Sequence, residues 1–107
     1  MHLENLQNQY RHKVEAWLTT NKYQVSEHIK DIMVSILLHR DRIVDHGGSF
    51  VQAFMANNLK DVIRFADDDV MANLRYIFQA FNNIDTYYAA KAYRELVALE
   101  HEQQTNL

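Results

Sequence analysis

The stretch that decides the fold class is residues 26–49, SEHIKDIMVSILLHRDRIVDHGGS. Ser26 is a favourable N-cap, and Glu27 places a negative charge in the first helical turn. Apolar residues then recur at spacings of three and four, which puts them on one helical stripe: Ile29, Ile32, Met33, Ile36, Leu37, Ile43 and Val44. Many helices end at a glycine in a left-handed conformation, and Gly47 is a candidate for this position. The stretch therefore predicts an amphipathic helix from about Glu27 to His46.

The rest of the chain also favours helices over strands. Its 107 residues contain no proline, and Gly47 and Gly48 are the only glycines. Because strands need turn residues about every 8–12 positions, a β-rich fold is excluded. Further apolar stripes predict helices over residues 3–18, 49–66, 70–81 and 86–102, with a bend near residues 57–58. We expect an all-α fold, a compact bundle of about five helices with mostly antiparallel neighbours.

Length and composition are typical of one globular domain. Hydrophobic residues make up 48% of the chain and charged residues 23%, which is far from the composition of disordered proteins. A chain of this length can bury a core without disulfides or metal ions. We expect a single helical domain over residues 1–107, with residues 103–107 as a frayed tail.

Charge and cysteine content limit the kinds of partner. The formal net charge is −3, from 11 basic and 14 acidic residues, so the broad positive field of nucleic-acid binders is missing and no direct nucleic-acid binding is expected. No apolar run approaches the ~18 residues of a membrane span, and a signal peptide is not recognisable. The absence of cysteine fits a reducing compartment. We expect a cytoplasmic protein that does not associate with membranes.

Six histidines raise the question of a metal site or of acid–base catalysis. On one helix, His28 and His39 would lie ~16 Å apart, which is too far to share one metal ion. Only His28 and Asp31 have a chelating spacing, and a site would need ligands from other helices. We therefore expect no catalytic residue, no cofactor and no metal. A histidine-based metal-binding bundle stays open as an alternative.

The run Asp67-Asp68-Asp69 lacks the glycine and the closing glutamate of a calcium-binding loop. Since aspartate is a favoured N-cap, we expect one of the three to cap the 70–81 helix. An acidic patch for a partner is the alternative.

Two apolar residues of the 27–46 helix, Val34 and Leu38, lie outside its main stripe and close to Asp41 and Asp45. Such a pair has two explanations: the helix is sandwiched between others, or it presents a surface to another chain. These four residues are the first group of candidates for partner binding.

Tyrosines form the second group of candidates. Tyr76, Tyr87 and Tyr88 lie in the last third of the chain. Tyrosine is frequent at protein interfaces because its ring buries a large area at little entropic cost. A place at the edge of the core is the alternative for these residues.

The segment His46-Gly47-Gly48-Ser49-Phe50-Val51, with Ala53, Ala66-Asp67 and Ala80-Phe81 after it, resembles short helical proteins of unknown function from bacteriophages and mobile elements. The resemblance implies a genomic context and no particular chemistry. Small phage proteins without catalytic residues are commonly inhibitors of host machinery, anti-CRISPR proteins among them. The implied site of action is the cytoplasm of the host cell.

These observations lead to one prediction and two alternatives. We expect a non-enzymatic protein–protein interaction module, and the resemblance implies a phage-encoded inhibitor of a host defence complex. The first alternative is a self-associating structural or regulatory protein, for example a homodimer with the 3–18 or the 27–46 helix at its two-fold contact. The second is the histidine-based metal-binding bundle.

Overall fold

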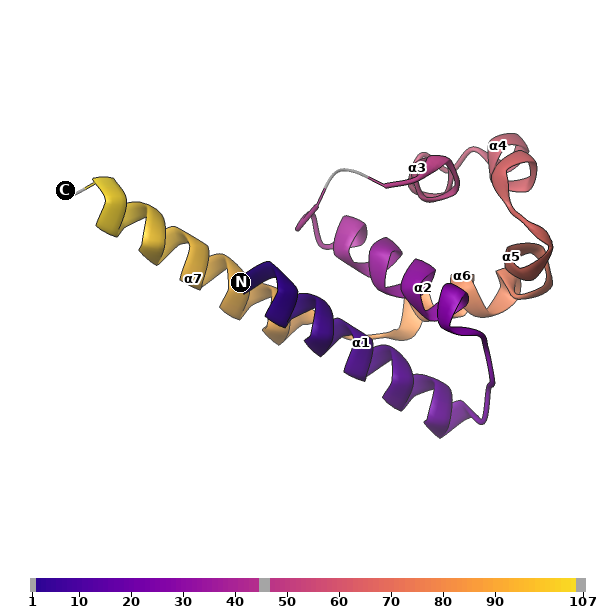
Figure 1. Ribbon diagram of the computed structural model, residues 1–107, viewed down its shortest axis with the longest axis horizontal. Coiled ribbons are helices and arrows are strands. Elements are labelled where there is room, and N and C mark those ends of the chain that lie inside the picture. Colours follow the sequence, from indigo (N-terminus) through magenta and orange to yellow (C-terminus); the bar gives the residue numbers. More distant parts are fainter. Residues whose placement is uncertain (1, 45–46, 106–107) are drawn as a thin grey trace.

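The computed structural model describes residues 2–44 and 47–105. These residues form seven helices and no strand (Figure 1). In chain order the helices are α1 (His2–Asn21), α2 (Glu27–Arg40), α3 (Ser49–Met55), α4 (Leu59–Phe65), α5 (Asp68–Ala72), α6 (Leu74–Asn83) and α7 (Tyr87–Thr105). The all-α class is confirmed, whereas the expected number of about five helices is too low.

Helix α2 lies at the centre and contacts α1, α3 and α6. Its N-terminus is where the sequence placed it, since the Ser26 hydroxyl accepts a hydrogen bond from the backbone N–H of Ile29 at 3.3 Å. Helices α1 and α2 contribute half of the buried core residues, namely Leu6, Tyr10, Val14, Leu18, Ile29, Met33, Ile36, Leu37 and Leu38. Burial of the apolar core residues is the main stabilising contribution to the fold.

Helix α2 ends at Arg40, six residues before the predicted end at His46. Arg42 has φ 59°, a left-handed conformation, and the N–H of Ile43 bonds the carbonyl of Leu38 at 2.9 Å. This is the hydrogen-bond pattern of a Schellman ending, which is usually built on glycine and here is built on arginine. Ile43 and Val44 leave the helix and still pack on the core from a loop.

Gly47 does not provide the left-handed residue that the sequence suggested, because neither glycine has a positive φ. Its role is to allow a close approach. A Cβ atom at this position would lie 3.0 Å from Cγ1 of Val51 and 3.1 Å from Nε2 of His39. The absence of a side chain at Gly47 therefore lets the backbone there approach His39 and Val51 closely.

The predicted 49–66 helix is two helices, α3 and α4, separated at the expected bend. Asn57 has φ 57°, and the side chain of Asn58 accepts a hydrogen bond from the backbone N–H of Asp61 at 3.2 Å. The bend is thus a break between two helices that pack on each other, and the second helix has its own N-cap. At the start of α3, Gly48 holds the N-cap position that was expected for Ser49.

The predicted 70–81 helix is also two helices, α5 and α6, which meet at Asn73. Asp67 caps α5, accepting a hydrogen bond from the N–H of Val70 at 2.8 Å, so the prediction that one of the three aspartates is a cap is confirmed. The side chain of Asn73 bonds the carbonyl of Asp69 at 2.9 Å. This local bond competes with continued helix, as asparagine side chains commonly do.

Helix α7 runs antiparallel to α1, lies beside its N-terminal half and then continues past it (Figure 1). Every side chain from Arg94 to Gln103 is exposed. The projecting helix gives the molecule its longest dimension, 51 Å. Among the described residues, no helix is long and apolar enough to cross a membrane.

Candidate functional site

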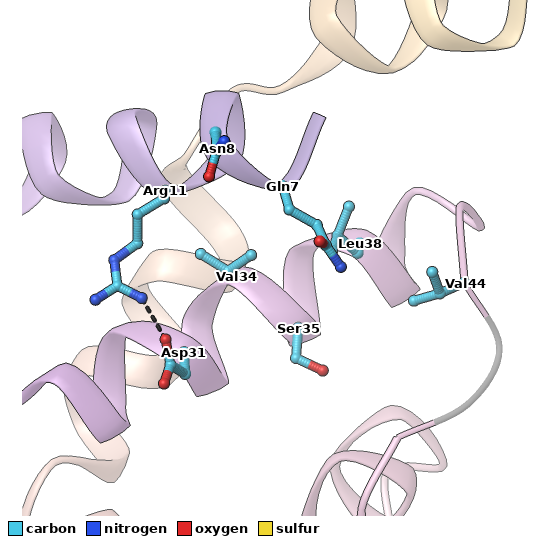
Figure 2. A pocket seen from close by; sticks show the side chains of 8 residues that line it. All are labelled: Gln7, Asn8, Arg11, Asp31, Val34, Ser35, Leu38 and Val44. Atoms are coloured by element: carbon cyan, nitrogen blue, oxygen red, sulfur yellow. Dashed lines mark hydrogen bonds and ion pairs between the residues drawn. The ribbon is translucent and has the colours of Figure 1, made fainter. Parts of the chain in front are cut away.

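A groove between α1 and α2 contains two of the residues that the sequence singled out. Its volume is about 460 Å³, and we call it the α1/α2 groove. It is lined by Gln7, Asn8, Arg11, Asp31, Val34, Ser35, Leu38 and Val44. Figure 2 shows Gln7 and Arg11 reaching from α1 toward α2, while Val34 and Leu38 point back toward α1.

The floor of the groove is apolar. Val34 is half-buried and Leu38 is only 3% exposed, so both belong to the packing between α1 and α2. Val44 closes one end from the loop that follows α2. Of the two explanations weighed for this off-stripe pair, the first is confirmed, because α2 is sandwiched between helices. The same residues also line an open hollow, and contact with another chain stays a prediction.

The rim of the groove is charged and internally paired. The Arg11 guanidinium bonds the carboxylates of Asp31 and Glu27, the residues one helical turn apart on α2. It also lies 3.4 Å from Glu15 on its own helix. Partial burial of Arg11 opposes its charge, but the bond to Asp31 and the neighbouring acids outweigh this and raise its pKa. Arg11 is thus a permanent cation that joins α1 to the N-terminal half of α2.

Three polar side chains of the groove have no hydrogen-bond partner among the described residues. No hydrogen bond between the described residues involves the side chain of Gln7, Asn8 or Ser35. Amide and hydroxyl groups both donate and accept hydrogen bonds. They are therefore available to the backbone of a bound segment.

Asp41, the third candidate, lies at the end of α2 in a polar network that faces inward. Its carboxylate accepts hydrogen bonds from the hydroxyls of Tyr10, at 2.6 Å, and Thr86, and it pairs with Arg40 at 3.0 Å. Burial opposes the charge of Asp41, but these hydrogen bonds outweigh it and lower its pKa. Asp41 therefore joins α1, α2 and the start of α7 within the fold.

Arg40 completes this network from α2. Its guanidinium donates to the backbone carbonyls of Phe81, at 2.7 Å, and Ile84, at 3.0 Å, and to the hydroxyl of Thr86 at 2.6 Å. The two carbonyls belong to the end of α6 and the turn after it, where helices leave such groups unpaired. Arg40 thus satisfies the end of α6 and positions the turn that starts α7.

The three tyrosines among the remaining candidates lie apart from the groove. Asp45 falls outside the described residues. Tyr76 is half-buried and stacks on Tyr23 with ring centroids 4.4 Å apart, at the edge of the core. Tyr87 and Tyr88 are exposed at the start of α7, with their rings edge to face at 5.2 Å. The structure therefore divides the predicted partner-binding set among separate regions.

The histidines of α2 have local partners. His28 lies 3.0 Å from Asp67, which links the first turn of α2 to the cap of α5. His39 bonds the backbone carbonyl of Ser35 at 2.7 Å through Nδ1, one turn back on its own helix. Within the part of the chain that the structure describes, no three side chains of the metal-binding types come together.

Sequence reasoning missed the α1 side of the groove. Gln7 and Arg11 are one helical turn apart on the polar side of α1, so their common face was visible in the sequence. The sequence did not show which helix lies opposite Gln7 and Arg11, because no sequence pattern says which side of α1 packs on α2. The ion pairs from Arg11 to α2 are likewise set by tertiary packing.

Comparison of the chain with models of protein families, with curated proteins and with solved structures found no match.

Proposed function

We propose that this protein is a non-enzymatic interaction module that binds a segment of a partner protein in the α1/α2 groove. The observation that carries the proposal is the combination of an aliphatic floor, formed by Val34 and Leu38, with unpartnered polar side chains above it. The volume of the α1/α2 groove, about 460 Å³, is within the range of ~300–1,000 Å³ that is usual for binding sites.

The groove suggests the chemistry of the bound segment. An aliphatic side chain of the partner would contact Val34 and Leu38, and its backbone would bond Gln7, Asn8 and Ser35. Such a combination of a small apolar centre with a polar rim is usual at protein interfaces. Because Arg11 is already surrounded by carboxylates, a charged partner group adds little, and we expect binding to depend weakly on salt.

The biological role that we propose is inhibition of a host defence complex by a phage-encoded protein of the anti-CRISPR kind, acting in the host cytoplasm. The support for this role is the resemblance of residues 46–81 to helical proteins of phages and mobile elements. The role and the groove are tested separately. Expression in bacteria with an active CRISPR system should raise phage plating efficiency, and unchanged plating would count against the inhibitory role.

A bulky residue on the α1 wall tests the groove itself. Asn8 is exposed, lines the groove and takes no part in the core, so Asn8→Trp should fill the hollow and leave the fold intact. Lys13→Trp is the matched control, since Lys13 is exposed on the same helix and does not line the groove. Tagged wild type and both variants are used to capture proteins, and the complex is then rebuilt from purified components.

The expected result is a specific partner protein that binds wild type and Lys13→Trp equally. Asn8→Trp should weaken binding at least tenfold in isothermal titration calorimetry, because loss of a few buried contacts exceeds 1.4 kcal/mol. Equal binding by all three proteins would place the partner elsewhere on the surface. Absence of any specific protein partner would contradict the proposed function.

A further inference from the structure

The C-terminal end of α7 makes few contacts with the rest of the chain, among them the bond from Arg94 to the backbone carbonyl of Asp41 and the one between His2 and Glu100. All its side chains from Arg94 to Gln103 are exposed, and Figure 1 shows this end extending beyond α1 and away from the other helices. Isolated helices shorter than ~12–15 residues are marginal in water, so helices of this kind are usually stabilised by packing.

One side of α7 carries an apolar stripe that begins beside α1 and continues into this end. It consists of Tyr88, Ala92, Leu96 and Leu99, and we call it the α7 stripe. At 100° per residue these four positions fall within a sector of roughly 80°. The exposed fractions are 78% for Tyr88, 45% for Leu96 and 52% for Leu99.

The α7 stripe does not face the core of its own chain. Ala90, which is buried, and Arg94, which bonds the backbone carbonyl of Asp41, lie on another side of the helix. Ala92 and Leu96 also line a shallow hollow between α7 and α1, together with Asn5 and Gln9. The stripe therefore continues into the surface formed jointly by α1 and α7.

We infer that a second copy of this chain covers the α7 stripe, with the two α7 helices packed antiparallel about a two-fold axis near Leu96. Two α1–α7 pairs then form a four-helix arrangement. A two-fold contact uses the same surface on both copies, so it requires the surface to be complementary to itself.

The charges beside the α7 stripe provide this self-complementarity. Lys91 and Glu102 are 11 residues apart, which places them about 20° apart on the same flank of α7. A two-fold axis perpendicular to both α7 helices places the same flank of each copy on the same side of the contact, and the two helices run in opposite directions. With the axis near Leu96, which lies midway between them, Lys91 of each copy is level with Glu102 of the other. The contact thus contains two opposite-charge pairs, and Glu95, which lies on the same flank within one turn of the axis, is the like charge that these pairs outweigh.

Oligomeric mass at increasing concentration is the first test. Light scattering coupled to size exclusion should give twice the 12.7 kDa of one chain in the micromolar to millimolar range. Leu96→Asp with Leu99→Asp should give the single-chain mass, with unchanged helical circular dichroism. Val97→Asp is the control, because Val97 is exposed on the other side of α7, and it should stay dimeric. A wild type that remains monomeric at millimolar concentration overturns the inference.

Disulfide trapping tests the placement of the axis. The chain contains no cysteine, so any disulfide in a single-cysteine variant is intermolecular. Leu96→Cys should form covalent dimers readily because the two copies of residue 96 meet near the axis, whereas Val97→Cys and Tyr88→Cys should not. Equal crosslinking at all three positions, or none at Leu96→Cys, contradicts the antiparallel arrangement.

Charge reversal tests the pairing between copies. Lys91→Glu should raise the dimer dissociation constant by roughly threefold to tenfold, because two exposed pairs are replaced by repulsion. Lys91→Glu combined with Glu102→Lys should restore it. Failure of the double variant to recover would overturn the proposed register. The α1/α2 groove is not involved, so Asn8→Trp should dimerise like wild type whether or not the groove binds a partner.

Discussion

Tyr10 shows how one buried hydroxyl connects parts of the chain that are distant in sequence. Its side chain is completely buried in the core, and its hydroxyl donates to Asp41 at 2.6 Å. Burial raises the pKa of Tyr10, and the bond to the Asp41 carboxylate raises it further. The neutral phenol is therefore the form that the native state stabilises.

Replacement of Tyr10 by phenylalanine should lower stability at neutral pH and change how stability depends on pH in alkaline solution. At pH 7, Tyr10→Phe should reduce the free energy of unfolding by about 1–2 kcal/mol, because the partly buried carboxylate of Asp41 loses a donor. Above pH about 10 the unfolded chain releases the Tyr10 proton and the native state keeps it, so wild type loses stability as pH rises.

Urea unfolding at pH 7 and at pH about 10.5 measures both effects. The difference between wild type and Tyr10→Phe should shrink at the higher pH, since the variant has no phenol to ionise. Tyr87→Phe is the control, because Tyr87 is exposed, and it should match wild type at both pH values. A constant difference would show that ionisation of Tyr10 does not contribute.

At the scale of elements, short polar residues divide the chain into more helices than the hydrophobic pattern suggests. Asn57 separates α3 from α4 in a left-handed conformation, and Asn73 separates α5 from α6. In both places the apolar spacing continues across the break, although Leu59, Phe65 and Met71 of this spacing are exposed in the structure. Periodicity alone therefore could not reveal these breaks.

Substitution of Asn57 distinguishes separate helices α3 and α4 from one continuous helix over residues 49–66. In the left-handed conformation, Asn57→Ala should lower the free energy of unfolding by about 1 kcal/mol, and Asn57→Gly should change it little. A continuous helix predicts the reverse order, because alanine has the highest helix propensity and glycine one of the lowest. Thermal unfolding of both variants decides between the two, and a more stable Asn57→Ala would contradict the observed break.

At the scale of the whole molecule, carboxylates hold the junctions between helices. Asp41 joins α1, α2 and the start of α7, Glu27 joins α2 to α1, and Asp67 joins α5 to α2. A hydrogen bond from Lys30 lowers the pKa of Glu27, and the backbone N–H of Val70 lowers that of Asp67. The pKa of Asp41 is lowered too.

Acid should therefore loosen the molecule. A carboxylate with a lowered pKa contributes stability above its unfolded pKa of about 4, and this contribution is lost as pH falls through the native pKa. Asp41→Asn should reduce the free energy of unfolding by about 2 kcal/mol at pH 7. Between pH about 5 and about 2, the free energy of unfolding of this variant should fall less than that of wild type. Asp68→Asn is the control, because Asp68 is exposed. Guanidinium unfolding over the same pH range should give it the same free energies of unfolding as wild type. Equal acid slopes for wild type and Asp41→Asn would contradict the role given to Asp41.

Much of the candidate site depended on tertiary contacts. The sequence identified Val34 and Leu38 as apolar residues that need an explanation beyond the main stripe of α2, and both line the α1/α2 groove. It placed Asp41 beside them on a helix that would continue to His46. In the structure Asp41 is the C-cap, because its bonds to Tyr10 and Thr86 stabilise the helix end there.

By itself, the sequence determined the all-α class, the place of α1 to within three residues at either end, the cap at Ser26 and a cap among the three aspartates, because helical periodicity and capping are local properties of neighbouring residues. Only the tertiary structure decided where α2 ends, that α7 projects past α1, and that Arg11 and Gln7 face Val34 across a groove. These features depend on which faces of distant segments pack together. That choice is made by burial and hydrogen bonding over the whole chain, which no local pattern contains.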